Sequence, residues 1–342
     1  MPRPHLLALP VATVLVLAAC SSGTGTADDG ATSAPSGAPA AEGAATQYPL
    51  TLDNCGTEVT FDAAPERVVT IKSSTAETML ALGLGDRVVG AAFLDGEVPQ
   101  WLAEEAEGTA VAEPFSDEVP GTEALLELEP DLVYAGWESN VSADGAGDRE
   151  TLASLGVPSY VAPAACKDPG YMPNPLTFED VWADVREVGQ IFDVAETAED
   201  VVLEQSAVLG AIVPDDRGLE ALWYSSGSDI PYVGAGIGAP QMILDAVGLG
   251  NVAGEVEDTW TSMSWEEVVD ADPDVIVLVD AAWNSAEDKI ARLQENPATA
   301  ELSAVAEERF LVVPFPASEA GVRNADAALS ISQGLAEIDI DD

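Results

Sequence analysis

Apolar and polar positions follow two different periods along this chain, and each period predicts one kind of element. Residues 48–61 alternate around Asn54-Cys55-Gly56, which predicts a β-hairpin. Short continuous apolar runs predict buried strands at 68–71, 88–90, 132–135, 159–161 and 219–224. Helical spacing predicts helices at 76–82, 123–129 and 151–155, the first capped by Ser74 or Thr75 from the loop 72–75. Strands and helices that alternate in this way predict an α/β fold.

The longest helical tract covers residues 178–213. Its apolar residues recur at helical spacing, with one break near 192–196. This tract separates two halves of similar length. We therefore expect an N-terminal α/β lobe with its leading hairpin at 48–177, an interlobe helix at 178–213 and a C-terminal α/β lobe at 214–342.

The two halves carry the same short motifs in the same order. Residues 82–86 (LGLGD) return as 247–251 (VGLGN), each at the end of an apolar helix. Residues 123–133 return as 266–276, where a helix is stopped by Pro-Asp and a buried strand follows. Two similar lobes are expected to face each other across a ligand cleft, which lies beyond the C-terminal ends of the strands.

The start of the chain predicts export. Residues 1–19 combine Arg3 with an apolar stretch, and Leu17-Ala-Ala-Cys20 resembles the lipobox of bacterial lipoproteins. On this interpretation 1–19 is a signal peptide, Cys20 carries the lipid, and 20–47 is a flexible tether of small and acidic residues at the outer face of the cell membrane. The alternative is an ordinary secretory signal in which Cys20 is incidental.

Charge and residue usage exclude several function classes. The chain has 61 acidic and 12 basic residues, a net charge of −49, which disfavours binding to nucleic acid. Its only histidine is His5 in the expected leader, so Ser-His-Asp and Cys-His catalysis and His-ligated metals are excluded from the mature chain. We expect no cofactor, no metal and no enzymatic activity. In an oxidising compartment Cys55 and Cys166 are expected to form a disulfide, with two free thiols as the alternative.

An ordered set of motifs resembles the class III solute-binding proteins of ABC importers, which carry ferric siderophores, cobalamin and haem. The set comprises 65–69 (PERVV), both Pro-Asp strands, 296–298 (NPA), 302–305 (LSAV) and Arg309-Phe310. The resemblance implies two Rossmann-like lobes joined by a long rigid helix. It also implies a small-molecule ligand, and an ABC permease with its ATPase subunits as partners. We expect the receptor itself to be a monomer.

Three stretches resemble a narrower, actinobacterial subgroup within that class. They are 223–229, 232–241 and 319–324. That subgroup is proposed to bind the phospholactyl precursor of the deazaflavin cofactor. The resemblance therefore implies a bulky, anionic, aromatic solute, and a ferric siderophore or cobalamin is the alternative.

Basic residues are scarce enough that their positions suggest the cleft. Lysine occurs only at 72, 167 and 289, and Lys72 and Lys167 both follow predicted strands. Arg323 lies in sequence that resembles the cleft lining of the family. Together they would form a positive cleft for an anionic ligand. Each could instead be an ordinary solvated side chain.

Aromatic and glycine residues give the second set of candidates. Ligand stacking is expected from side chains near strand ends or in stretches similar to the family's cleft, namely Phe115, Trp137, Tyr224, Trp260 and Trp283. Ser226 lies in one of the subgroup stretches. Gly236 lies in a glycine-rich loop whose N–H groups could hold phosphate at a helix start. The alternatives are core packing for the aromatic residues and a tight turn for the glycines.

Glu123 and Glu266 are equivalent acids of the two repeats. In the family that the chain resembles, one surface Glu on each lobe meets arginines of the permease. The alternative is a Glu that the helix dipole favours in the first turn. Two further function classes stay open, an extracytoplasmic enzyme on the same fold and a structural or adhesion lipoprotein.

Overall fold

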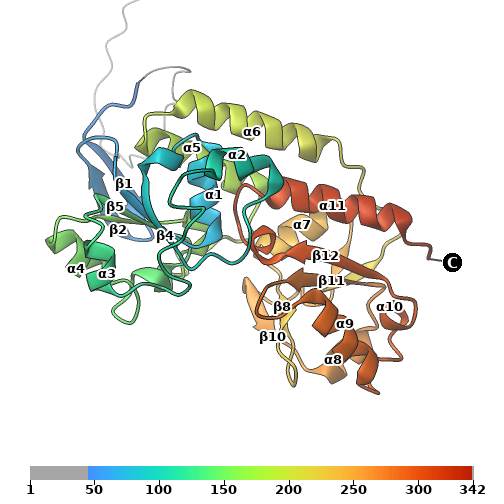
Figure 1. Ribbon diagram of the computed structural model, residues 1–342. Coiled ribbons are helices and arrows are strands. Elements are labelled where there is room, and N and C mark those ends of the chain that lie inside the picture. Colours follow the sequence, from blue (N-terminus) through green and yellow to red (C-terminus); the bar gives the residue numbers. More distant parts are fainter. Residues whose placement is uncertain (1–44, 341–342) are drawn as a thin grey trace, which may run out of the picture. The chain divides into compact units, whose positions relative to one another are not determined.

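The computed structural model describes residues 45–340, and the expected leader, Cys20 and nearly all of the expected tether lie outside that range. The described part has a mixed α/β fold, with two β-sheets, the helices that accompany them and a separate β-hairpin (Figure 1). No helix within it is both long enough and apolar enough to span a bilayer.

The first lobe is built on a parallel sheet with strand order β4-β3-β5-β6. The strands are β3 (Val68–Ile71), β4 (Val88–Ala92), β5 (Leu132–Ala135) and β6 (Ser159–Val161), and they match the predicted apolar runs. Its helices are α1 (Ser73–Ala81), α2 (Ala103–Ala106), α3 (Thr122–Leu126) and α4 (Arg149–Ser154). Because helices cover a parallel sheet on its faces, its strands are apolar throughout rather than alternating.

The predicted hairpin consists of β1 (Leu50–Asn54) and β2 (Thr57–Phe61), which pair antiparallel. Asn54 attaches it to the first lobe, since its side chain exchanges two 2.8 Å hydrogen bonds with the main chain of Val161. The expected disulfide is present between Cys55 in the turn and Cys166 after β6, with the Cα atoms 5.3 Å apart. The hairpin is therefore fixed to the sheet covalently and by hydrogen bonds.

The second lobe contains a mixed sheet with strand order β10-β8-β7-β11-β12 and β9 beside β7. The strands are β7 (Glu220–Ser226), β8 (Tyr232–Gly234), β9 (Gly250–Asn251), β10 (Trp260–Ser262), β11 (Val275–Asp280) and β12 (Phe310–Pro314). Strands β7, β11 and β12 are parallel, whereas β8 and β10 run antiparallel to their neighbours. The helices are α7 (Ala239–Val247), α8 (Trp265–Ala271), α9 (Ala286–Glu295), α10 (Ser303–Ala306) and α11 (Asn324–Glu337).

The repeated Pro-Asp motif has the same structural role in both lobes. The Asp131 carboxylate accepts hydrogen bonds from the N–H groups of Glu66 and Arg67 at 2.8 and 2.9 Å, just before β3. The Asp274 carboxylate accepts one from the Glu220 N–H at 2.8 Å, at the start of β7. Each Asp thus joins the start of its own strand to the start of the neighbouring strand and fixes their register.

The expected interlobe helix is two helices packed against each other, α5 (Phe178–Ile191) and α6 (Ala195–Gly210). The chain turns at 192–194, inside the predicted break, and Asp193 adopts a left-handed φ of 58°. Gly189 permits the close packing, because a Cβ there would lie 2.4 Å from the Ala198 side chain. The single long rigid helix is therefore corrected to a helical hairpin.

The predicted start of the first helix is also wrong. α1 begins at Ser73 rather than 76, and no side chain caps it. The Ser73 hydroxyl instead accepts a hydrogen bond from the Asp95 N–H at 2.8 Å, and the Thr75 hydroxyl bonds back to the Ile71 and Lys72 carbonyls. The Ser73 hydroxyl therefore bonds the loop after β4, and the Thr75 hydroxyl bonds the end of β3 and the residue that follows it.

Candidate functional site

A cavity of about 430 Å³ lies beyond the C-terminal ends of the parallel strands of both lobes. The first lobe contributes residues that follow β5 and β6, such as Trp137 and Lys167. The second lobe contributes residues that end or follow β7 and β12, such as Ser226 and Glu319. This is the position that the strand-end argument predicts for the ligand cleft.

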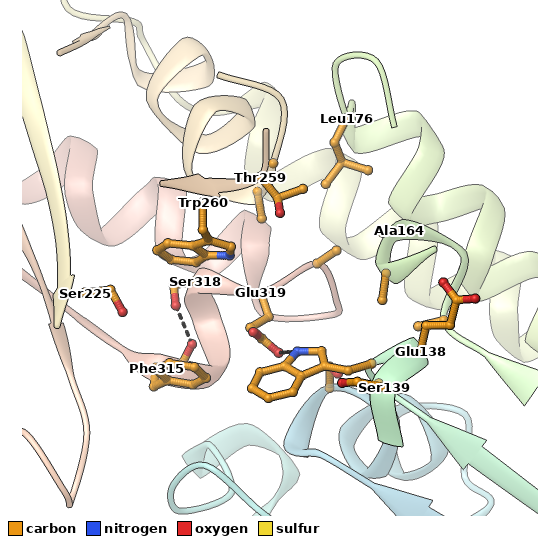
Figure 2. A pocket seen from close by; sticks show the side chains of 18 of the residues that line it. Glu138, Ser139, Ala164, Leu176, Ser225, Thr259, Trp260, Phe315, Ser318 and Glu319 are labelled. Atoms are coloured by element: carbon orange, nitrogen blue, oxygen red, sulfur yellow. Dashed lines mark hydrogen bonds between the residues drawn. The ribbon is translucent and has the colours of Figure 1, made fainter. Parts of the chain in front are cut away.

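Aromatic rings form much of the cavity wall. Five line it, from both lobes: Trp137, Tyr232, Trp260, Trp283 and Phe315. Tyr232 stacks on Trp260 with the ring centroids 5.9 Å apart and the planes 15° apart, and Trp283 meets Phe315 edge-on at 5.8 Å. Figure 2 shows Trp260 above Phe315, with the Glu319 side chain to the right of both rings. Such walls suit a solute with a broad apolar or conjugated face.

Glu319 is the most perturbed charged group of the lining. Its Oε2 accepts a hydrogen bond from the Trp137 indole N–H at 2.7 Å (Figure 2). Burial raises the pKa of Glu319 to about 7, although Lys72, Lys167 and the Trp137 hydrogen bond each oppose the rise and Asp95 adds to it. This carboxyl therefore changes charge near neutral pH.

Lys167 lies at the edge of the cavity, as expected. Its backbone N–H donates to the Glu138 carboxylate at 2.7 Å, and its ammonium group donates to the Thr259 hydroxyl of the other lobe at 3.4 Å. Lys167 is exposed, and of the residues within 45–340 that line the cavity it is the only Lys or Arg. Its positive charge is thus accompanied by a nearby acid.

Lys72 does not line the cavity, which corrects the predicted placement. Its side chain is fully buried, forms an ion pair with Asp95 and lies over the Trp137 ring at 3.6 Å from the centroid. The rings of Phe93 and Phe315 are its other neighbours, at 4.5 and 4.9 Å. Asp95 comes from the loop after β4, which pairs with β3, so a basic and an acidic residue that both follow strands meet beneath the cavity.

Arg323 is likewise outside the lining. Its guanidinium binds both carboxylate oxygens of Glu77 on α1, at 2.5 and 2.6 Å, and the Glu97 carbonyl oxygen at 2.7 Å. Arg323 precedes α11, so the ion pair joins the two lobes. Burial raises the pKa of Glu77, and the Arg323 hydrogen bond and charge counteract the rise. Two of the three basic residues expected in the cleft are thus buried in ion pairs, and Lys167 lines the cavity.

Three further candidates lie elsewhere. The Tyr224 side chain is buried in the hydrophobic core of the second lobe and does not line the cavity. The Arg292 guanidinium donates a hydrogen bond to its hydroxyl at 3.0 Å. Phe115 packs beside Gly90 on β4, and it is 36% exposed. The Gly236 N–H donates to the Val256 carbonyl at 2.9 Å, and the N–H groups of its neighbours are also bonded. That glycine-rich loop therefore offers no free N–H at Gly236 for a phosphate.

The remaining candidates lie either in the cavity lining or on the surface. Trp137, Ser226, Trp260 and Trp283 line the cavity with Lys167. Glu123 and Glu266 are exposed in the first turns of α3 and α8, one on each lobe. Among residues 45–340, no group of three or more His, Cys, Asp or Glu side chains could hold a metal ion.

Sequence reasoning missed four lining residues of note, Glu138, Tyr232, Phe315 and Glu319. Phe315 directly follows β12, so the strand-end argument that found Trp137 could have found it as well. Tyr232 and Glu319 lie in stretches that were singled out for their resemblance. Among 61 acidic residues, nothing in the sequence distinguishes Glu319 or Glu138.

This architecture and its sequence are similar to those of known proteins. The periplasmic binding protein family matches residues 68–317. The chain belongs to this family. A periplasmic binding protein from Veillonella parvula has a similar structure, with a TM-score of 0.74, 26% identity and coverage of 85% of this chain and 98% of that one. The structure titled ABC-type Fe3+-hydroxamate transport system from Saccharomonospora viridis gives a TM-score of 0.72, 28% identity and coverage of 84% and 99%.

Curated relatives show a similar level of sequence identity. A cobalamin-binding protein of Halobacterium salinarum is 29% identical over 241 residues, which cover 68% of this chain but only 59% of that protein. The uncharacterized ABC transporter substrate-binding lipoprotein YvrC of Bacillus subtilis is 24% identical over 297 residues, 84% of this chain and 86% of that protein. Among these names, one gives cobalamin and one gives Fe3+-hydroxamate as the solute, and the other two name no solute.

Glu319 should make the stability of this periplasmic binding protein depend on pH. Its pKa is 4.5 when unperturbed and about 7 in the fold, so between these values the folded chain holds a proton that the unfolded chain has released. Stability from this group is therefore present at low pH and is lost as the pH rises to about 7. Glu319→Gln should stabilise the chain more at about pH 8 than at about pH 5, measured by urea denaturation. An equal effect at both pH values would contradict this.

Proposed function

We propose that this chain is the solute-binding component of an ABC importer. In this role it captures a bulky organic solute between its lobes and delivers it to a permease. The observation that carries the proposal is the cavity itself, in which five aromatic rings from both lobes surround one space. Relatives named as cobalamin-binding or substrate-binding proteins, and a solved structure titled as part of a ferric hydroxamate transport system, support it. We also propose that the chain is a monomer and that a lipid on Cys20 anchors it to the outer face of the cell membrane.

The proposed solute is a corrinoid or a ferric chelate, with one broad face against the aromatic walls. A cavity of about 430 Å³ holds a ring system, and the rest of a larger solute would extend through the opening. The deazaflavin precursor is the second candidate, because its flat conjugated ring would stack equally well on Trp260. Its phosphate finds less support, since Lys72 and Arg323 are buried in ion pairs.

The test is calorimetric titration with three solutes, cyanocobalamin, a ferric hydroxamate and a phospholactyl deazaflavin precursor. We expect one of the first two to bind and Trp260→Ala to weaken it by about 2- to 12-fold, because a lost aromatic contact is worth about 0.5–1.5 kcal/mol. Trp101→Ala is the matched control, since Trp101 is 46% exposed and lies outside the lining. Binding of the deazaflavin precursor alone would favour the second candidate, and binding of none would refute this solute class.

We further propose that Glu123 and Glu266 contact the permease. Charge reversal at both (Glu123→Lys, Glu266→Lys) should abolish uptake in cells and leave solute affinity unchanged, because both side chains are exposed and lie outside the cavity lining. The control reverses Glu127 and Asp270, which are also exposed in or beside the same two helices. Uptake that survives in the first variant, or is lost equally in both, would overturn this role.

A further inference from the structure

One oxygen of the Glu319 carboxylate has no protein partner. Oε2 accepts the Trp137 indole hydrogen bond, while no residue within 45–340 donates a hydrogen bond to Oε1. Figure 2 shows this carboxylate to the right of Trp260 and Phe315, and all three residues line the cavity that the solute would occupy. A partly buried acceptor that lacks a donor costs free energy until a ligand or a water supplies one.

The accessible charge of the cavity is acidic rather than basic. Lys72 and Arg323 are buried against Asp95 and Glu77, so neither presents a free cation to a solute. The described lining holds three charged side chains, the acids Glu138 and Glu319 and the exposed Lys167, whose ammonium group bonds only the Thr259 hydroxyl among the described residues. Acids thus outnumber bases in the described lining, and no Lys or Arg within 45–340 lies close enough to Glu319 to form an ion pair with it.

We propose that the solute donates a hydrogen bond to Glu319 from an amide, amine or hydroxyl group, and that the cavity rejects solutes whose phosphate or carboxylate would face it. This deepens the proposed function and rests on it in taking the cavity as the solute site. An anionic group of a solute placed there would be repelled by the negative charge of the Glu319 carboxylate. Neither the solute oxygen nor the Glu319 oxygen would then receive a hydrogen bond from the other. Glu319 is therefore the residue that determines specificity for neutral or cationic solutes.

The selectivity should weaken in acid. The groups that face Glu319 are Trp137, which donates to it, and the charges of Lys72, Asp95 and Lys167. With the pKa of Glu319 at about 7, the carboxyl is mostly ionised, and so has no proton to donate, only at higher pH. Below that value its proton can be donated, and the rejection of anions relaxes.

The test uses three probes that share one ring and differ in charge, namely tryptamine (cationic), indole-3-ethanol (neutral) and indole-3-acetate (anionic). At about pH 8 the wild-type protein should bind tryptamine at least about tenfold more tightly than indole-3-acetate, measured by ligand-observed NMR titration. The ratio should fall to below about threefold in Glu319→Gln and should shrink in the wild type at about pH 5.5. Glu138→Gln, which removes the other lining carboxylate, should keep most of the ratio.

Three outcomes would overturn the proposal. They are equal or reversed affinities in the wild type at about pH 8, a ratio unchanged by Glu319→Gln, and a ratio abolished instead by Glu138→Gln. The wild-type comparison at two pH values keeps the test valid if the Glu319 variant folds poorly. If no corrinoid or ferric hydroxamate binds but the Glu319-dependent preference for tryptamine persists, the proposed solute class fails and this inference stands.

Discussion

Glu77→Ala should lower the free energy of unfolding by about 3–5 kcal/mol. The side chains of Glu77 and Arg323 are only 3% and 8% exposed, so the variant leaves an uncompensated guanidinium in the interior. The loss should be larger than that of an ordinary surface charge, because the guanidinium also keeps its desolvation penalty. Urea denaturation at neutral pH measures it.

Two variants make this prediction specific. Glu77→Leu combined with Arg323→Met replaces the buried pair with apolar groups and should recover much of the loss, since no charge is left unpaired. Glu179→Ala removes one of the two acidic partners of Arg186, in a pair whose Glu side chain is 69% exposed, and should cost less than about 1 kcal/mol. A loss of similar size for Glu77→Ala and Glu179→Ala would show that the interlobe pair is not buried in solution.

Removal of the disulfide should cost about 2–5 kcal/mol. Cys55 and Cys166 are 111 residues apart, so the bridge restricts a large part of the unfolded chain. Cys55→Ser combined with Cys166→Ser should unfold at a lower denaturant concentration. Reduction of the wild type should reproduce the shift, and the reductant should leave the double variant unaffected. A wild type that reductant does not destabilise would contradict the prediction.

Local patterns were sufficient to predict most of the fold. A strand such as β5 is apolar at every position because both faces are covered, and the Pro-Asp motif that precedes it recurs before β11. The helical pair α5 and α6 was not predicted, because helical periodicity alone does not show whether a break is a kink or a reversal. The reversal depends on the left-handed turn at Asp193 and on the contact between Gly189 and Ala198.

The sequence predicted cavity-lining residues where the distance from the end of a strand decides whether a side chain reaches the cavity. Trp137 and Ser226 lie at or beyond strand ends and reach the cavity, whereas Tyr224, two residues before the end of β7, points into the core. The error over Lys72 and Arg323 has a different cause. Their acidic partners, Asp95 and Glu77, are two of 61 acids, and only the folded chain shows which acid meets which cation.

The helical hairpin of α5 and α6 has a consequence for cooperativity. Phe178 and Val181 near the start of α5 pack into the core of the second lobe, whereas Val185 and Val188, farther along, pack into the core of the first. α6 likewise contacts both cores, through Val202 in one and Leu209 against the other. The hydrophobic core of each lobe therefore includes residues of helices that it shares with the other lobe. The two lobes should melt in one transition, and a fragment that ends between them would expose an apolar face prone to aggregation.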